Sequence, residues 1–291
     1  MDEKIDCPLF HSGKVRDIYD LGDEFLIVSS DRISAFDHIL PSEIAGKGKI
    51  LNMLSAFWFD FVKDIMPNHI ISADFENFPQ KLKKYEYLRA RSMIVKKAKR
   101  VDIECIVRGY LSGSGWKEYQ NSQDICSISL PNNLKESSKL PQPIFTPSTK
   151  EEEGKHDENI SYEKMADIVG QETAKQLKDY SIALYNKAAS YALSKGIILA
   201  DTKFEFGFYN GELILIDEIF TPDSSRFWEL SKYKEGMPQD SLDKQFVRDY
   251  LESVKWDKVS CPPKLPQEVI DKTIKKYISA YETLTERKFN V

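Results

Sequence analysis

Acidic, basic and hydroxyl side chains are concentrated in two strand-like runs between Ile198 and Trp228, in a pattern that is suited to binding a metal ion and phosphate. Asp201, Lys203 and Glu205 recur at every second residue, so in a strand they share one face. Phe204, Phe206 and Phe208 share the other face. Carboxylates gathered around one lysine repel each other unless a cation joins them, and Mg²⁺ with nucleotide phosphates prefers such oxygen ligands. The alternative is a solvent-exposed face with an ordinary cross-strand salt bridge.

The position of Asp217 relative to this face depends on the hairpin turn at Asn210-Gly211. A two-residue turn would pair Phe204 with Asp217 and place that carboxylate on the apolar face. A three-residue loop, with Gly211 in the left-handed conformation, would pair Lys203 with Asp217. We expect the second register, because it groups the acids with the lysine. The buried face would then consist of Phe204, Phe206, Phe208, Ile214 and Ile216.

Length and composition describe a globular protein. A chain of 291 residues commonly forms two lobes, and we expect these to be residues 1–97 and 98–291. With 41% hydrophobic residues, 30% charged residues and a net charge of -5, it lacks the basic character that is usual for nucleic-acid binding. No long apolar run or signal-peptide core is seen, which predicts a cytoplasmic protein without a membrane span. The four cysteines are widely spaced and indicate neither zinc nor a disulfide framework.

Two segments near the N-terminus contain residues that could bind anions. Gly13 would let the backbone approach a phosphate closely, and Lys14 and Arg16 would point to one side of a strand. Arg32 and Asp37 lie in a polar stretch after the next apolar strand, where binding residues often collect. The plain alternatives are an edge strand protected by charge and a capped loop.

A second group of anion-binding candidates follows the alternating segment 101–110. Arg108 precedes a run of serines and glycines, 112–115, whose N–H groups and hydroxyls suit a phosphate monoester; a flexible turn is the alternative. Arg226 follows the central hairpin, and we expect its guanidinium group to contact another anion. The charged segment 146–160 is typical of solvated low complexity.

Apolar periodicity predicts the elements that carry these residues. Helices are expected near 50–65, 171–195, 240–254 and 266–285. A strand is expected at 92–95, followed by a basic connector between the lobes, and residues 131–147 are expected to form a proline-rich loop.

Seven motifs, taken together and in order, resemble one enzyme family. They are GKVRDIYD, SSDRISAFD, GKGKILNMLS, ECIVRGYLSGSGWKEY, IFTPSTKEEEGKHDENIS, ADTKFEFGF and LIDEIFTPDSSRFW. The set is similar to the phosphoribosylaminoimidazole-succinocarboxamide synthase, or SAICAR synthetase, family. HDENIS resembles the longer, fungal-type members, whereas residues 72–87 and those after Val254 carry little of the resemblance.

The resemblance implies an ATP-dependent ligase of de novo purine biosynthesis. It joins L-aspartate to the carboxylate of carboxyaminoimidazole ribonucleotide and releases ADP and phosphate. The implied fold is α+β, with two lobes of antiparallel sheet that are similar to kinases or ATP-grasp proteins and hold the nucleotide between them. These small molecules and Mg²⁺ are the implied ligands, with neither nucleic acid nor membrane as a partner and the oligomeric state left open. A small-molecule kinase of the same architecture and a nucleotide-binding regulator without turnover are the alternatives.

The resemblance also implies roles for individual residues. The implied catalytic residues are Lys203, Asp201 and Glu205. Nucleotide contacts are implied for Gly13, Lys14, Val15, Arg16, Lys96, Glu104, Lys203, Glu205 and Asp217, with Glu205 and Asp217 as Mg²⁺ ligands. Substrate contacts are implied for Ser34, Asp37, Arg108, Ser112, Gly113, Ser114, Asp157, Glu158, Asp223, Ser225 and Arg226. A register slip at the hairpin would exchange the roles of Asp217 and Glu218.

Overall fold

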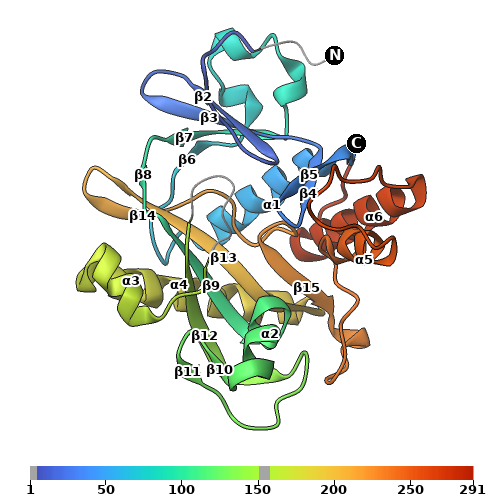
Figure 1. The fold of residues 1–291 in the computed structure, drawn as a ribbon. Coiled ribbons are helices and arrows are strands. Elements are labelled where there is room, and N and C mark those ends of the chain that lie inside the picture. The colour runs from blue at the N-terminus through green and yellow to red at the C-terminus, as the bar shows by residue number, and fades with distance from the viewer. Residues whose placement is uncertain (1–4, 151–157, 291) are drawn as a thin grey trace.

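Two antiparallel sheets form the framework of the protein in the computed structural model, which describes residues 5–150 and 158–290 (Figure 1). The first sheet packs one face against three short 3₁₀ helices, through a core that includes Leu26, Phe75, Leu82, Leu88 and Ile94. Its strands, in spatial order, are β1 (Leu9–Ser12), β2 (Arg16–Asp20), β3 (Glu24–Ser29), β7 (Ser92–Lys96) and β6 (Ile70–Ser72). The 3₁₀ helices are η1 (Phe75–Asn77), η2 (Gln80–Leu82) and η3 (Glu86–Leu88).

The second sheet is organised around one long strand, β13 (Ile197–Tyr209). The first part of β13 pairs with β9 (Ile103–Tyr110) and β15 (Ser225–Glu229), and the last part pairs with β14 (Glu212–Ile216) and β8 (Lys99–Arg100). The edge strand β12 (Lys139–Thr149) pairs with β9. Because β13 pairs with four other strands, the residues along one of its faces lie beside residues of several strands.

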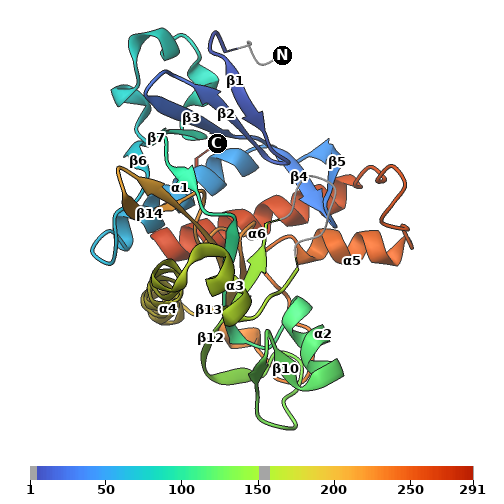
Figure 2. The ribbon, with the colours of Figure 1, turned by 60° about the vertical axis from the view of Figure 1, so that its left-hand side comes forward.

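Helices cover one side of this second sheet and bury the main core (Figure 2). Helix α4 (Gln171–Ser194) contacts β13, β9 and β12, while α1 (Lys47–Phe61) packs against α6 (Gln267–Thr285). Trp58, Phe204 and Phe220 are almost completely buried there. The remaining elements are the hairpin β4 (Arg32–Ala35) and β5 (His38–Glu43), α2 (Gly113–Ser122), β10 (Asp124–Ile125), β11 (Ile128–Ser129), α3 (Tyr162–Val169), η4 (Leu230–Lys232) and α5 (Gln245–Ser253).

The predicted helices are present, but the proline-rich loop expected over 131–147 is partly wrong. Its second half belongs to β12, an eleven-residue strand with a register irregularity between Lys139 and Ile144. Proline cannot donate a ladder hydrogen bond, but an edge strand pairs on one side only and tolerates it. The prolines in the second half of this segment therefore belong to an edge strand and not to a loop. Within the described part of the chain, no helix is long and apolar enough to cross a membrane.

The predicted register of the central hairpin is wrong. Phe206 pairs with Leu215 and Tyr209 pairs with Glu212, so the turn contains only Asn210 and Gly211. Both turn residues have positive φ, 52° and 83°, as a type I′ turn requires, and the Asn-Gly sequence favours this turn. Consequently the residues that share the phenylalanine face are Leu213 and Leu215, in place of the expected Ile214 and Ile216.

Candidate active site

Charged side chains line one face of the paired strands β9 and β13. In the observed register Asp201 lies opposite Arg108 and Lys203 lies opposite Ile106, so residues at alternate positions of both strands face the same side. Asp201, Lys203 and Glu205 share this face. Phe204 and Phe206, on the opposite face, lie in the core. The shared face predicted for these three residues is therefore what the structure shows.

A charged cluster surrounds Lys203 toward the β14 end of this face. The Lys203 Nζ lies 2.6 Å from Glu104 Oε1 and 3.3 Å from Glu205 Oε1, and the other Glu205 oxygen lies 2.6 Å from Lys150 Nζ. Burial alone would lower the pKa of Lys203, but Glu205, Glu104 and Asp217 together raise it well above the usual lysine value. Lys203 is thus held fully charged, with 32% of its side chain exposed to solvent.

Asp217 joins this cluster by a route that differs from the predicted register. Strand β14 ends at Ile216, and Asp217 adopts a left-handed conformation with φ of 70°, which takes it out of the strand alternation. Its two oxygens lie 2.7 and 2.9 Å from the Arg16 guanidinium. Burial raises the pKa of Asp217, but Arg16 and Lys203 outweigh it and lower the pKa below the ordinary value.

Glu218 lies beside Asp217 but has a different environment. One oxygen lies 3.5 Å from Arg16 and the other accepts a hydrogen bond of 2.8 Å from Thr221 Oγ1. Burial dominates here and raises the pKa of Glu218. Of the two adjacent acids, Asp217 is the one held ionised by two cations.

The charged cluster fits a metal ion that is shared with phosphates better than a protein-only metal site. Among the described residues, no three His, Cys, Asp or Glu side chains come together as a metal site. Mg²⁺ usually takes one or two carboxylates and completes its shell with phosphates and water. Glu205 and Asp217, which both act on the charge of Lys203, offer such a pair. The cluster as defined here consists of Arg16, Glu104, Lys150, Lys203, Glu205, Asp217 and Glu218.

Two guanidinium groups meet at the other end of the same face, in what we call the arginine seat: Arg108, Arg226, Asp201 and the start of α2. Arg108 is 2% exposed and donates to Thr146 Oγ1 at 3.0 Å and to Ser114 Oγ at 3.1 Å. Asp201 pairs with Arg226 and lies 3.6 Å from Arg108. One carboxylate between two guanidinium groups leaves a net positive charge, which suits a phosphate monoester.

Gly113 leaves space for the Arg226 side chain in the arginine seat. It begins α2 with φ of 57°, and a Cβ atom at this position would lie 2.3 Å from the Arg226 Nη2 atom. Only glycine therefore permits Arg226 its observed position. The short polar run after Arg108 is the start of a helix packed on this seat, and Ser112 precedes its first turn.

Asp223, expected to contact substrate, is instead the centre of a buried anchor. Its carboxylate lies 2.8 Å from the fully buried Lys47 Nζ and accepts a hydrogen bond of 2.7 Å from Tyr277. Burial alone would raise its pKa, but Lys244 and Lys47 lower it. Asp223 joins the start of α1 to α6 and to the residue preceding α5. These contacts explain its burial without a ligand.

Ser225 does not lie with Arg226. It pairs with Thr202 on the opposite face of the sheet, is 5% exposed, and its hydroxyl lies 2.8 Å from Thr202 Oγ1. Because side chains alternate along a strand, Arg226 and Ser225 must point to opposite sides. The grouping of Ser225 with the substrate residues is therefore not supported by the geometry.

The segment around Gly13 is a turn between β1 and β2, and its two cations, Lys14 and Arg16, have different partners. Gly13 donates its N–H to the Arg16 carbonyl at 2.7 Å, and the Arg32 guanidinium donates to the Gly13 and Lys14 carbonyls. Val15 lies in the same turn. Lys14 pairs with Asp37 at the tip of the β4–β5 hairpin, whereas Arg16 faces Asp217. Arg32 therefore stabilises the turn, and these hydrogen bonds account for its position without a ligand.

The remaining predicted residues that the structure describes belong to neither the charged cluster nor the arginine seat. Ser34 is largely buried in β4, and the Lys96 Nζ donates to the Asn68 carbonyl at 3.1 Å where β7 ends. Glu158 is exposed and its carbonyl accepts from the Thr149 N–H. Asp157 lies outside the described residues.

Lys150 belongs to the charged cluster, and the sequence did not lead us to predict this. It sits directly after β12, in a stretch that composition alone describes as solvated, yet its ammonium contacts Glu205 and lowers the pKa of Asp217. Lys150 comes directly after a strand that pairs with β9, and binding residues often collect where strands end. This position is the signal that could have identified it.

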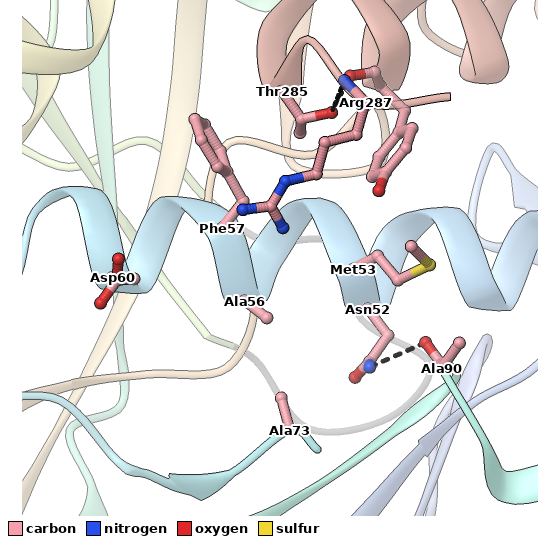
Figure 3. Close-up of a pocket in the computed structure, with 10 residues that line it drawn as sticks. Asn52, Met53, Ala56, Phe57, Asp60, Ala73, Ala90, Thr285 and Arg287 are labelled. Carbon is pink, nitrogen blue, oxygen red and sulfur yellow. Dashed lines mark hydrogen bonds between the residues drawn. The ribbon is translucent and has the colours of Figure 1, made fainter. Parts of the chain in front are cut away.

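A surface pocket of about 310 Å³ lies away from these clusters, over the middle of α1 (Figure 3). Arg287 extends above the helix between Phe57 and Met53, and Asn52 projects from the other side toward Ala90. The pocket contains none of the predicted site residues. Its lining residues are Asn52, Met53, Ala56, Phe57, Asp60, Ala73, Ala90, Tyr281, Thr285 and Arg287.

Comparison with known proteins identifies the family of the chain. The SAICAR synthetase family model matches residues 9–263. The chain belongs to the SAICAR synthetase family. It is 59% identical over 278 residues, 95% of each chain, to the phosphoribosylaminoimidazole-succinocarboxamide synthase of Thermodesulfovibrio yellowstonii. Its counterpart from Geobacter sulfurreducens is 57% identical over 281 residues, covering 96% of this chain and 95% of that one.

Solved structures of SAICAR synthetases share the fold. SAICAR synthase from Saccharomyces cerevisiae, complexed with SAICAR, has a TM-score of 0.90 and 44% identity, covering 100% of this chain and 99% of that one. A SAICAR synthetase in complex with ADP has a TM-score of 0.71 and 25% identity, covering 97% and 99%. The mixed fold of helices and antiparallel sheets is therefore a fold of this family, as the sequence motifs predicted.

Proposed function

We propose that the chain joins L-aspartate to the carboxylate of carboxyaminoimidazole ribonucleotide, using ATP and releasing ADP and phosphate, in purine biosynthesis. The family membership supports this reaction. The observation that carries the proposal is the arrangement on one face of β9 and β13, where the charged cluster and the arginine seat stand side by side along two paired strands. One cluster suits a metal–nucleotide complex and the other suits a phosphate monoester.

The chemistry requires activation of a carboxylate. A carboxylate oxygen is a poor leaving group, so its attack on the γ-phosphorus of ATP, with departure of ADP, converts it to an acyl phosphate. The amine of aspartate then attacks the acyl carbon, inorganic phosphate leaves, and the amine loses a proton. Lys203, held charged by its neighbours, is suited to stabilise the negative charge that develops on the transferred phosphoryl group.

The charges of the two clusters support this assignment of ligands. The charged cluster has four carboxylates and three cations, so it has room for a further cation. Mg²⁺, when bound, would supply positive charge between the nucleotide phosphates. Glu205 and Asp217 are the residues that would hold it. The arginine seat, with its excess of positive charge, would orient the ribonucleotide through its phosphate and keep the reacting carboxylate near Lys203.

The division of the chain suggests where the nucleotide binds. We propose a kinase-like or ATP-grasp-like architecture in which residues 1–97 cover ATP and residues 98–291 provide the catalytic and substrate-binding surface. The salt bridge between Arg16 of β2 and Asp217 after β14 joins the two sheets next to Lys203 and supports this arrangement. ADP is bound in one related structure. Small charged substrates of this kind also favour a cytoplasmic location.

Two variants and one assay test the function. ADP release by purified protein is measured with carboxyaminoimidazole ribonucleotide, in the presence and absence of L-aspartate, together with the mass of the product. We expect aspartate-dependent ADP release, a succinocarboxamide product, and loss of both in Lys203→Met. The control is Lys175→Met, which removes a lysine from an exposed pair on α4. A phosphorylated product that keeps its phosphate when aspartate is present would favour the kinase alternative instead.

A further inference from the structure

Strand β13 contains a β-bulge at the point where it meets the arginine seat. Leu199 pairs with Phe227 of β15. The next pair along the two strands is Asp201 with Arg226, which leaves Ala200 as an extra residue without a partner in β15. One extra residue on one strand defines a bulge, and bulges change the direction of the side chains that follow them.

The extra residue decides which face of the sheet Arg226 occupies. If the ladder continued without the bulge, Ala200 would pair with Arg226, and Asp201 would pair with Ser225. Because paired residues share a face and neighbours along a strand alternate, Arg226 would then lie on the opposite face from Asp201. On its other side Asp201 pairs with Arg108 of β9. The bulge therefore brings two guanidinium groups to the face of one carboxylate.

The hydroxyl group of Tyr185, on α4, holds the bulge from the core side of the sheet. It donates a hydrogen bond of 2.6 Å to the carbonyl of Leu199, the residue at which the bulge begins, and its side chain is 3% exposed. Strand β9 leaves room for this hydroxyl, because a Cβ atom at Gly109 would overlap its oxygen. Gly109 directly follows Arg108, so Tyr185 enters the sheet next to the pair of Arg108 with Asp201.

We propose that Tyr185 is a positioning residue, whose hydroxyl group holds the bulge in β13 so that Arg226 stays in the arginine seat. This inference rests on the proposed binding of the ribonucleotide phosphate at that seat. Tyr185 lies in the core on the helix-covered side of the sheet, whereas the arginine seat lies on the other side. It therefore acts on ribonucleotide affinity through the position of Arg226, and nucleotide binding at the charged cluster does not depend on it.

A matched pair of variants tests the role of Tyr185. Tyr185→Phe removes the hydroxyl group and keeps the ring packing, so we expect it to fold. The control is Tyr191→Phe, which removes another α4 hydroxyl that donates to a backbone carbonyl, that of Leu284, at 2.8 Å. Each variant loses one such hydrogen bond, so urea denaturation should show a similar loss of stability in both.

The measurement that distinguishes the two variants is calorimetric titration of the full-length protein with carboxyaminoimidazole ribonucleotide, and separately with ADP and Mg²⁺. A displaced Arg226 would weaken a charge-assisted hydrogen bond to the phosphate. We therefore expect ribonucleotide affinity to fall about tenfold, which is about 1.4 kcal/mol, in Tyr185→Phe alone. The affinity for ADP should change less than about twofold in both variants. A similar fall in ribonucleotide affinity in Tyr191→Phe would show general damage and contradict the proposal.

A double-mutant cycle with Arg226→Ala tests whether Tyr185 acts through Arg226. If it does, then Tyr185→Phe weakens ribonucleotide binding no further in the Arg226→Ala background. An equal loss in both backgrounds, or unchanged affinity in Tyr185→Phe beside a weakened Arg226→Ala, would refute the positioning role. If Arg226→Ala itself binds the ribonucleotide like the unmodified protein, the proposed role of the arginine seat fails, and the inference about Tyr185 fails with it.

Discussion

Replacing Gly113 by alanine should damage the arginine seat without removing any functional group. The added Cβ would lie 2.3 Å from Arg226 Nη2 and 2.7 Å from Cζ, so the guanidinium must move. A guanidinium–phosphate hydrogen bond contributes about 1.5–3 kcal/mol, which corresponds to a rise of roughly 10- to 100-fold in KM for the ribonucleotide. The left-handed φ adds a cost of about 1 kcal/mol to folding.

Gly196→Ala is the matched control for this prediction. Gly196 also has a left-handed φ, 77°, but a Cβ there would have no atom within 4 Å. Both variants should lose a similar amount of stability in urea denaturation, and only Gly113→Ala should raise the KM for the ribonucleotide, with the KM for ATP nearly unchanged. An unchanged ribonucleotide KM in Gly113→Ala would refute the assignment of the arginine seat to the substrate phosphate.

Three further predictions concern the charged cluster and the buried anchor. Asp223→Asn should lower the free energy of unfolding by about 3–5 kcal/mol at pH 7, because it leaves Lys47 buried without a counter-ion. Since the folded pKa of Asp223 is lowered, its contribution is complete above about pH 4 and is lost progressively as the pH falls further. The stability difference between the variant and the unmodified protein should therefore be smaller at pH 3 than at pH 7 in denaturation curves. Lys150→Ala should lower kcat at least about tenfold but change the free energy of unfolding by less than about 1 kcal/mol, because the lysine is partly exposed; equal kcat values in steady-state assays would remove it from the site. Asp217→Asn should lower kcat/KM about 100-fold or more, because Asp217 is held ionised by Arg16 and Lys203. Glu218→Gln should cost less than about tenfold, because a glutamine oxygen can still accept the hydrogen bond from Thr221. The reverse order in the same assay would exchange their roles.

The local parts of the site were predictable from the sequence because period-two alternation fixes which side chains share a strand face. Asp201, Lys203 and Glu205 followed from that rule alone. Asp217 did not, because its position depends on a left-handed conformation just after the strand and on a salt bridge with Arg16, which is far away in the sequence. The Asn-Gly sequence favours the two-residue turn that the structure shows. We predicted a three-residue loop because it would group Asp217 with Lys203, and that prediction is wrong.

Long-range partners account for the other differences. Asp223 has the composition of a binding loop, and only the fold reveals that Lys47 and Tyr277 already satisfy its carboxylate. Lys150 stands in a charged segment whose composition suggests solvent, and its contact with Glu205 depends on where β12 ends. Local pattern therefore predicts faces and turns, while the partner of each charge depends on tertiary packing.

The central claim is that Lys203, Glu205 and Asp217 share one metal–phosphate site. A crystal structure of the protein with ADP and Mn²⁺ in place of Mg²⁺ tests it directly, because the anomalous signal of manganese locates the ion. We predict the ion within about 2.0–2.3 Å of an oxygen of Glu205 or Asp217, with the terminal phosphate of ADP close to Lys203. An ordered ion and nucleotide bound elsewhere, with all three side chains far from both, would contradict the account.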